Sequence, residues 1–326
     1  MTYRCNLKCS YCYSEKFRNT ADLDEIDVAG WNNIIEQLLD MKCKNVIVTG
    51  GESMLRKDLM PVWKKAKNSG MYVKLLTNGT LLSDKLVKEL KASVNEVSIS
   101  IDSIDENAND ANRGIGTHSK VLRSIELLKN NEVFWSGQIV INHKSLPYLE
   151  KTSKWLADQS GNSPTISILV STHVDDDESD ACFTEFDRLD STGMMGKIEE
   201  QYTLLNGTTC GAANTIVAIS PDGYLHPCKG LMQEQFRGMN ILHFGLKEAR
   251  EKSINLQRVR ELSFSEVEKC KKCSLFKLCF AGGCRAYAVM RTGSLYGYVG
   301  DAVCRARRRR VISGIIDRVN PMIGGK

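Results

Sequence analysis

The sequence has no apolar stretch of the ~18 residues that a membrane-spanning helix needs, and its N-terminus shows no signal-peptide pattern. It also has no internal repeat and no low-complexity tract. The formal net charge is only +5, which does not by itself imply a nucleic-acid partner. These absences predict a cytoplasmic protein that works neither in a membrane nor on nucleic acid.

Cysteine, in contrast, is plentiful, with 12 in 326 residues. Because thiols stay reduced in a chain without an export signal, we expect metal sites rather than disulfides, and thiolates are the preferred ligands of iron–sulfur clusters. Three cysteines lie in the first 12 residues and seven lie between residues 210 and 304. Only Cys43 and Cys182 stand alone, and we expect both to be buried small apolar residues.

Up to residue 175, short β-branched runs alternate with amphipathic segments. The runs predict strands at 45–48, 72–76, 96–101, 138–142 and 165–170. The amphipathic segments predict helices near 27–41, 57–69, 83–92, 117–130 and 146–158. This alternation is typical of an α/β protein with a parallel sheet, which right-handed crossovers would curl into a barrel or part of one.

The rest of the chain has a different pattern. Residues 176–209 are predicted to be a connecting region, with an acidic loop at 175–180 and a helix-like segment around 183–205. Beyond it, runs at 215–220 and 224–227 flank Pro221-Asp222-Gly223, which predicts a β-hairpin. A closing helix is expected at 306–319, and its basic block at 307–310 is either a solvated helix face or a docking site for an acidic peptide.

The first three cysteines, Cys5, Cys9 and Cys12, stand in the run CNLKCSYC. This spacing presents three thiolates to one [4Fe–4S] cluster and leaves the fourth iron without a protein ligand. Clusters that only transfer electrons normally have four cysteine ligands, and a structural zinc site also needs four ligands. The run therefore favours a cluster whose open iron binds a small molecule.

Together with Tyr11 before the last cysteine, this run resembles the motif of the radical S-adenosylmethionine (radical SAM) superfamily. The resemblance implies that the open iron binds SAM and that an electron splits the SAM sulfonium bond. The resulting 5′-deoxyadenosyl radical then removes a hydrogen atom from the substrate. It also implies a partial, TIM-like (β/α)6 barrel. Only residues 1–4 precede Cys5, so either the first strand is very short or the start of the chain is missing, and we favour a truncated or misassigned start.

Three segments at predicted strand ends resemble SAM-binding motifs of this family. Gly50-Gly51-Glu52 resembles the GGE motif, which binds the SAM amino group, although a Gly-Gly turn before a helix would give the same letters. Ser100 matches a serine that contacts SAM. Arg113 either pairs with the SAM carboxylate or forms an ordinary loop salt bridge. Asp102 and His143 are also strand-end residues, but no catalytic base can be assigned among them.

The C-terminal cysteines resemble the SPASM extension of radical SAM enzymes, which holds two auxiliary four-iron clusters and would bring the total to three. The resemblance assigns one cluster to Cys270, Cys273, Cys279 and Cys304, and the other to Cys210, Cys228 and Cys284. The second set is one thiolate short, and four residues rather than three separate its Cys284 from Cys279. A zinc ribbon of Cys270, Cys273, Cys279 and Cys284 is the alternative, but it leaves the other three cysteines unexplained.

These resemblances imply a radical SAM barrel at 1–175, a connecting region at 176–209 and a SPASM domain at 210–326. SPASM relatives act largely on peptides and proteins, and the sulfatase-maturating branch has an aspartate where this chain has Lys229. We therefore expect an oxidoreductase that removes two electrons from a ribosomally synthesised precursor peptide and forms a thioether or carbon–carbon crosslink. Oxidation of a small molecule such as a haem precursor, or non-catalytic electron transfer, are the alternatives.

The expected partners follow from the same resemblance. A flavodoxin- or ferredoxin-type protein would supply electrons, and the precursor peptide would be the substrate. A separate protein that binds the leader of that peptide is also compatible with the sequence.

Overall fold

The computed structural model describes residues 1–12, 14–15, 24–168, 176–191, 211–276, 284–305, 308–309 and 311–312. Within them, five strands form one parallel sheet in the order β1-β2-β3-β4-β5. The strands are β1 (Asn45–Val48), β2 (Tyr72–Thr77), β3 (Glu96–Ser100), β4 (Trp135–Ile141) and β5 (Thr165–Ile168). The five predicted strands are confirmed, although β4 begins at Trp135 rather than at residue 138.

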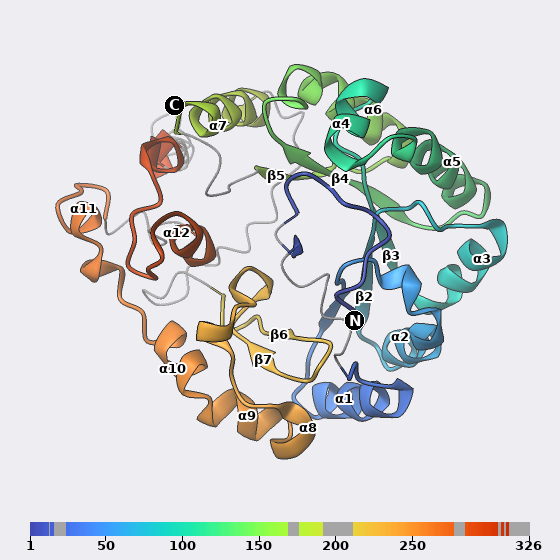
Figure 1. The fold of residues 1–326 in the computed structure, drawn as a ribbon, viewed down its shortest axis with the longest axis horizontal. Helices are drawn as coiled ribbons and strands as arrows, with labels where there is room; N and C mark the ends of the chain where they lie inside the picture. Colours follow the sequence, from blue (N-terminus) through green and yellow to red (C-terminus); the bar gives the residue numbers. More distant parts are fainter. Residues whose placement is uncertain are drawn as a thin grey trace, which may run out of the picture.

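Helices cover the convex side of this curved sheet, so the sheet and helices form a half-barrel (Figure 1). The helices predicted before and between the strands are confirmed as α1 (Val28–Asp40), α2 (Met60–Asn68), α3 (Asp84–Ser93), α5 (Thr117–Asn130) and α6 (Leu149–Ser160). Two of them begin later than predicted, because the short 3₁₀ helices η3 (Lys57–Leu59) and η4 (Leu146–Tyr148) precede α2 and α6. A third, η2 (Ser53–Leu55), follows β1.

Helix α4 (Glu106–Arg113) was not predicted from the sequence. Its residues, ENANDANR, are almost all polar, so the segment lacks the apolar periodicity by which amphipathic helices are recognised. Its end signals are nevertheless present. The Asp105 side chain caps the N-terminus by accepting a hydrogen bond from the Ala108 amide, and Gly114 with a φ of 108° follows the C-terminus.

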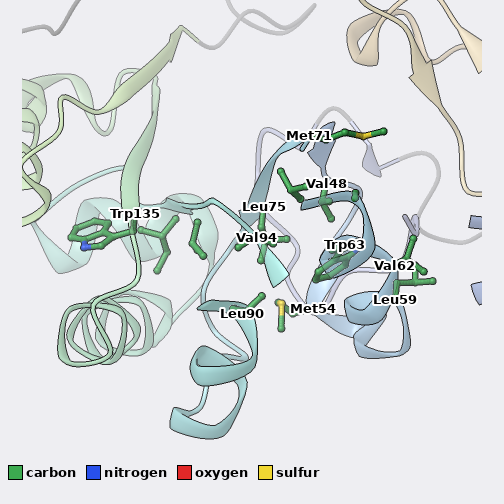
Figure 2. Packing of buried hydrophobic residues seen from close by; sticks show 14 of the residues in the cluster. Val48, Met54, Leu59, Val62, Trp63, Met71, Leu75, Leu90, Val94 and Trp135 are labelled. Carbon is green, nitrogen blue, oxygen red and sulfur yellow. The ribbon is translucent and has the colours of Figure 1, made fainter. Parts of the chain in front are cut away.

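The core lies between the sheet and the outer helices (Figure 2). Val48 of β1, Trp63 of α2 and Leu75 of β2 are at most 1% exposed there. Each large apolar side chain buried in this way stabilises the fold by ~1.5–3 kcal/mol relative to exposure. The Gly137 backbone packs so closely on α6 that a Cβ would lie 2.6 Å from Leu156 Cδ1, which shows that Gly137 faces the helices. Its neighbour Ser136 therefore points to the concave side.

C-terminal to the sheet, α7 (Asp176–Ser191) replaces the acidic loop predicted at 175–180, and that prediction is wrong from residue 176 on. Acidic residues at a helix N-terminus are stabilised by the helix dipole, so a run of them is compatible with a helix start. Of the helix-like segment predicted at 183–205, α7 accounts for the part up to Ser191, and the remainder lies outside the described residues.

The predicted hairpin is confirmed as β6 (Ala218–Ile219) and β7 (Leu225–His226), which pair in antiparallel fashion. It is shorter than predicted, and Gly223 in its turn has a φ of 88°. Short helices follow the hairpin in chain order. They are η5 (Lys229–Leu231), η6 (Glu234–Phe236), α8 (Ile241–Phe244), α9 (Leu246–Lys252), α10 (Ile254–Arg260), η7 (Phe264–Glu266), α11 (Glu268–Lys271) and α12 (Arg285–Thr292).

This C-terminal region lies across the open side of the half-barrel in Figure 1 and is tied to α1 and the segment before it. The Ile26 amide donates to the Pro221 carbonyl at 2.7 Å, and the Leu246 amide donates to Gln37 Oε1. Of the closing helix predicted at 306–319, only residues 308, 309, 311 and 312 are described, and they are helical. None of the helices that the structure describes has the length and apolarity needed to cross a bilayer.

Candidate functional site

The three cysteines of the N-terminal run lie on one loop beside the carboxyl end of the sheet. All three are half-buried, and none forms a disulfide with a described cysteine. Burial raises the pKa of the Cys9 thiol, the nearby Arg113 opposes this rise, and the thiols of Cys12 and Cys5 add to it. The Cys9 thiol therefore lies within electrostatic range of the other two thiols of the run.

The backbone around Gly50 and Gly51 binds the segment that leads into this loop. The Gly51 amide donates to the Thr2 carbonyl at 2.8 Å, and the Glu52 amide donates to the Arg4 carbonyl at 2.9 Å. A Cβ on Gly50 would lie 2.3 Å from the Thr2 oxygen, and one on Gly51 would lie 2.2 Å from the Arg4 oxygen. The two glycines thus admit the backbone that leads into the cysteine run, a role that the sequence did not predict.

The carboxylate of Glu52 joins the ends of two strands. It is 1% exposed and accepts hydrogen bonds from the Met54 amide at 2.9 Å, the Asn78 amide at 2.7 Å and Thr77 Oγ1 at 2.8 Å. Burial raises its pKa, although these three donors act in the opposite direction. Asn78 in turn donates to Asn6 Oδ1 at 2.9 Å, so the turn after β2 also holds the cysteine loop.

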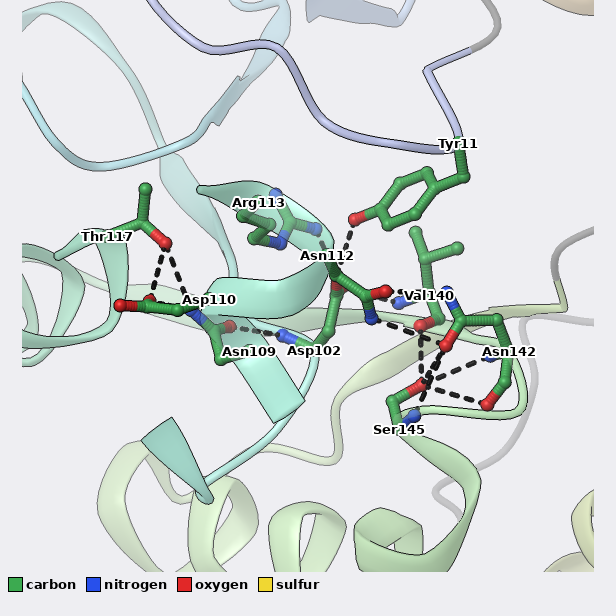
Figure 3. Close-up of polar contacts among 10 residues, drawn as sticks. All are labelled: Tyr11, Asp102, Asn109, Asp110, Asn112, Arg113, Thr117, Val140, Asn142 and Ser145. Atoms are coloured by element: carbon green, nitrogen blue, oxygen red, sulfur yellow. Dashed lines mark hydrogen bonds and ion pairs between the residues drawn. The ribbon is translucent and has the colours of Figure 1, made fainter. Parts of the chain in front are cut away.

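A second polar group is centred on Asp102, two residues after the end of β3 (Figure 3). Its side chain is fully buried. Tyr11 Oη donates to Oδ2 at 2.5 Å, and Oδ1 accepts from Arg113 Nη2 at 2.7 Å and from the Val140 amide at 3.1 Å. Asp102 therefore connects the cysteine loop, α4 and β4, and its carboxylate is too fully engaged to act as a free base.

Arg113, the last residue of α4, is 6% exposed and forms an ion pair with Asp102. Burial works against its charge, whereas the Asp102 carboxylate raises its pKa, so it stays a cation. Its Nε is buried and has no hydrogen-bond partner in the described part of the chain. The predicted salt bridge is thus present, and a donor for an additional anion remains beside it.

The helix α4 is itself fixed between the cysteine loop and β4. The Ser10 amide donates to the Asn112 carbonyl at 2.9 Å. The side-chain amides of Asn112 and Asn142 bond to each other, with Nδ2 of Asn142 donating at 2.8 Å. These positioning residues were missed because α4 was missed.

Ser100 and His143, two other residues predicted at strand ends, have different surroundings. Ser100 ends β3, is half-buried, and its hydroxyl forms no hydrogen bond within the described ranges. His143 is exposed and pairs through Nδ1 with Glu178 of α7 at 2.8 Å. Ser100 therefore lies at the same end of the sheet as Asp102, whereas His143 is engaged by α7.

The concave side of the sheet carries a polar cluster that the sequence analysis did not identify. Glu96 forms an ion pair with Lys74 at 2.8 Å and accepts from Tyr72 Oη at 2.9 Å and Ser136 Oγ at 2.6 Å. Burial opposes ionisation of Glu96, but the bonds from Lys74 and Ser136 lower its pKa overall. Alternation along β2 to β4, which places these residues on the side opposite to the helices, was the available signal.

Among the C-terminal cysteines, Cys210 and Cys279 lie outside the described residues. The Cys273 amide donates to the Cys270 carbonyl at 3.0 Å, so these two lie within one turn. Arg308 Nη2 donates to Cys273 Sγ at 3.6 Å, and its charge interacts with both Cys273 and Cys304. The three described members of the first predicted set therefore lie close together.

Two members of the second predicted set, Cys228 and Cys284, are described. Cys228 directly precedes η5 and Cys284 directly precedes α12. These two helices are in contact, because a Cβ on Gly230 would lie 2.7 Å from the Ala286 methyl carbon. Both cysteines thus stand at the N-termini of neighbouring elements.

Comparisons with known proteins agree with this architecture. Residues 1–156 match the model of the Radical SAM superfamily. The chain is 27% identical to the cysteine-type anaerobic sulfatase-maturating enzyme of Clostridium perfringens, covering 86% of each protein. It is 23% identical to the PqqA peptide cyclase of Granulibacter bethesdensis, covering 90% of this chain and 83% of that protein.

Solved structures of anSMEcpe share the fold. The form with bound AdoMet superimposes with a TM-score of 0.77 at 22% identity and covers 100% of this chain and 98% of that one. The form with AdoMet and the Cp18Cys peptide has a TM-score of 0.74 at 22% identity, with 98% and 97% covered.

A parallel half-barrel with a three-cysteine loop at its edge is the architecture of a radical SAM enzyme, and residues 1–156 of this chain match the model of the radical SAM superfamily. Within it, the chain is related to the sulfatase-maturating enzymes and the PqqA peptide cyclases. Its cofactors are accordingly SAM and a [4Fe–4S] cluster. The residues suit both, because three half-buried thiols on one loop are ligands that a cluster needs, and Arg113 Nε is a buried donor without a partner among the described residues.

Proposed function

We propose that this enzyme is a maturase that oxidises a ribosomally synthesised precursor peptide by two electrons and forms a crosslink, either thioether or carbon–carbon. The observation that carries the proposal is similarity along most of the chain to proteins that act on sulfatases or on a peptide, rather than over the barrel alone. A related structure with a bound peptide supports the same substrate class.

In this proposal Cys5, Cys9 and Cys12 hold the cluster that binds SAM. Tyr11, Ser100 and the backbone of Gly50-Gly51-Glu52 line the SAM site, and the side chain of Glu52 keeps the ends of β1 and β2 together. Arg113 uses its open Nε to bind the SAM carboxylate while its Nη2 stays on Asp102. When bound, SAM and the cluster supply the radical that removes hydrogen from the peptide.

We further propose two auxiliary clusters, one held by Cys270, Cys273, Cys279 and Cys304 and the other by Cys210, Cys228 and Cys284. Their role follows from electron balance. Loss of a hydrogen atom leaves a peptide radical, which has one electron more than the closed-shell crosslinked product, so this electron and a proton must leave as the new bond forms. A cluster held by either set of cysteines would supply an acceptor for this electron, and the proton would pass to solvent.

The same proposal divides the chain into a barrel at 1–175, a connecting region at 176–209 and a SPASM domain at 210–326. A flavodoxin- or ferredoxin-type protein would reduce the first cluster, and a separate protein would present the leader of the peptide. Lys229, a cation where the sulfatase-maturating branch has an aspartate, favours a peptide substrate other than a sulfatase.

The test uses protein reconstituted with iron and sulfide without oxygen, SAM, a reductant, and the short peptide encoded next to the gene. The proposal expects mass spectrometry to show loss of two hydrogens from the peptide, and no loss with Cys9→Ala. A reconstituted enzyme that cleaves SAM but leaves every neighbouring peptide unchanged would contradict the assigned substrate.

A further inference from the structure

Asp102 is the point at which three parts of the SAM edge meet. Its carboxylate is fully buried, and its three donors come from the cysteine loop, from α4 and from β4 (Figure 3). Its own amide donates to Asn109 Oδ1 at 3.1 Å, which binds it to α4 a second time. A carboxylate removed from water in this way requires all of its partners, because a buried charge without them is unfavourable.

Tyr11 and Arg113, whose side chains both bond to Asp102, also face each other. The guanidinium carbon of Arg113 lies 5.7 Å from the centre of the Tyr11 ring. The Tyr11 hydroxyl donates to Asp102 Oδ2 at 2.5 Å, on the carboxylate oxygen that Arg113 leaves open. Tyr11 directly precedes Cys12 in the chain. Tyr11, Asp102 and Arg113 thus form one unit beside a predicted cluster ligand.

We propose that Asp102 is a positioning residue that couples the cysteine loop to SAM binding, because it holds Tyr11 and Arg113 together and leaves Arg113 Nε directed at the SAM carboxylate. The proposal rests on the assignment of Cys5, Cys9 and Cys12 to the cluster and of Arg113 to SAM. Asp102 itself touches neither cofactor in this account. It fixes the angle of the guanidinium through Nη2, and it fixes the loop through the Tyr11 hydroxyl.

Coupling of this kind has a signature that simple destabilisation lacks. If Asp102 transmits the position of Tyr11 to Arg113, the effect of losing the Tyr11 hydroxyl on SAM affinity should depend on whether Asp102 is present. Residues that act independently would instead show additive effects on the free energy of SAM binding.

The experiment measures SAM affinity from the change in the EPR spectrum of the reduced cluster, together with iron per chain. No peptide is added, so failure to modify a peptide does not affect the outcome. We expect Tyr11→Phe to retain its iron and to bind SAM about fivefold more weakly than the wild type. When Asp102→Asn is already present, adding Tyr11→Phe should weaken SAM binding by less than about twofold relative to Asp102→Asn alone. Asp105→Asn, which alters only the N-cap of α4, should bind SAM like the wild type.

Three outcomes would count against the proposal or against its basis. Equal effects of Tyr11→Phe in both backgrounds would overturn the coupling. Unchanged SAM affinity in Asp102→Asn with full iron content would do the same. A wild-type protein that loads a cluster but shows no spectral change with SAM would overturn the site assignment itself.

If Asp102→Asn does not fold, a second double-mutant cycle between Tyr11→Phe and Arg113→Lys, which leaves Asp102 in place, decides the question. Additive effects of these two substitutions on the free energy of SAM binding would overturn the proposal.

Discussion

The carbonyl oxygen of Arg4 lies 2.2 Å from the position that a Cβ on Gly51 would occupy. The contact is between two backbones, so no side chain can move aside to relieve it. Arg4 directly precedes Cys5, the first residue of the cysteine run. Any side chain at position 51 would therefore displace the loop that is predicted to hold the cluster.

We accordingly expect Gly51→Ala to displace the cysteine run and to reduce both the iron retained after anaerobic reconstitution and the SAM-dependent spectral change. The control is Gly161→Ala at the C-terminal end of α6, where the added methyl group meets nothing within 4 Å but the φ is 68°. That control should lose about 1 kcal/mol of stability from backbone strain and keep its iron. Full iron and normal SAM binding in Gly51→Ala would refute this expectation.

Glu52 should contribute to stability independently of any ligand. A glutamine at this position can offer only one accepting oxygen to the Met54 amide, the Asn78 amide and Thr77 Oγ1, and its amino group would face a donor. We expect Glu52→Gln to lower the free energy of unfolding of the iron-free protein by about 1–3 kcal/mol in urea titrations. Glu36→Gln, an exposed residue of α1, is the control and should change it little. Equal stability of both variants would show that Glu52 is not the link between β1 and β2.

Cys182 should be chemically inert. Its side chain is 2% exposed, and burial, with the charge of Glu178 as a smaller cause, raises its pKa to about 11. At pH 8 only about one in a thousand of its thiols would be ionised. We expect iodoacetamide to leave Cys182 unmodified in the folded protein, as read by peptide mass spectrometry. Rapid alkylation at pH 8 would contradict its burial.

Cys43 provides the internal comparison for that experiment. It is half-buried rather than buried, so the sequence-based expectation was right for Cys182 and wrong for Cys43. Its Sγ donates to the Asn45 carbonyl at 3.3 Å. We expect it to react faster than Cys182, because access rather than packing controls the rate at such a site.

The proposed auxiliary cluster can be separated from the SAM site by iron content. We expect Cys273→Ala to lose about four irons per chain relative to the wild type and still to cleave SAM. Cys9→Ala should lose the same amount and should not cleave SAM. If Cys273→Ala instead loses a single zinc, the zinc ribbon is correct and this auxiliary cluster is not.

The sequence predicted the five strands and most of their helices because β-branched runs and apolar periodicity report directly on burial. It did not predict α4, since ENANDANR has no apolar face and is held through Asp110, Asn112 and the Asp102–Arg113 ion pair. It also could not show that Gly51 serves the Arg4 backbone, because that contact joins segments far apart in the chain. Asp105 and Gly114, the end signals of α4, were the clues available.

The most direct test of the central claim is reductive cleavage of SAM. With the anaerobically reconstituted protein and dithionite, the account predicts that 5′-deoxyadenosine and methionine form in equal amounts, and that Cys9→Ala forms neither. A wild-type protein that carries its full complement of iron and sulfide and yields no 5′-deoxyadenosine would contradict it.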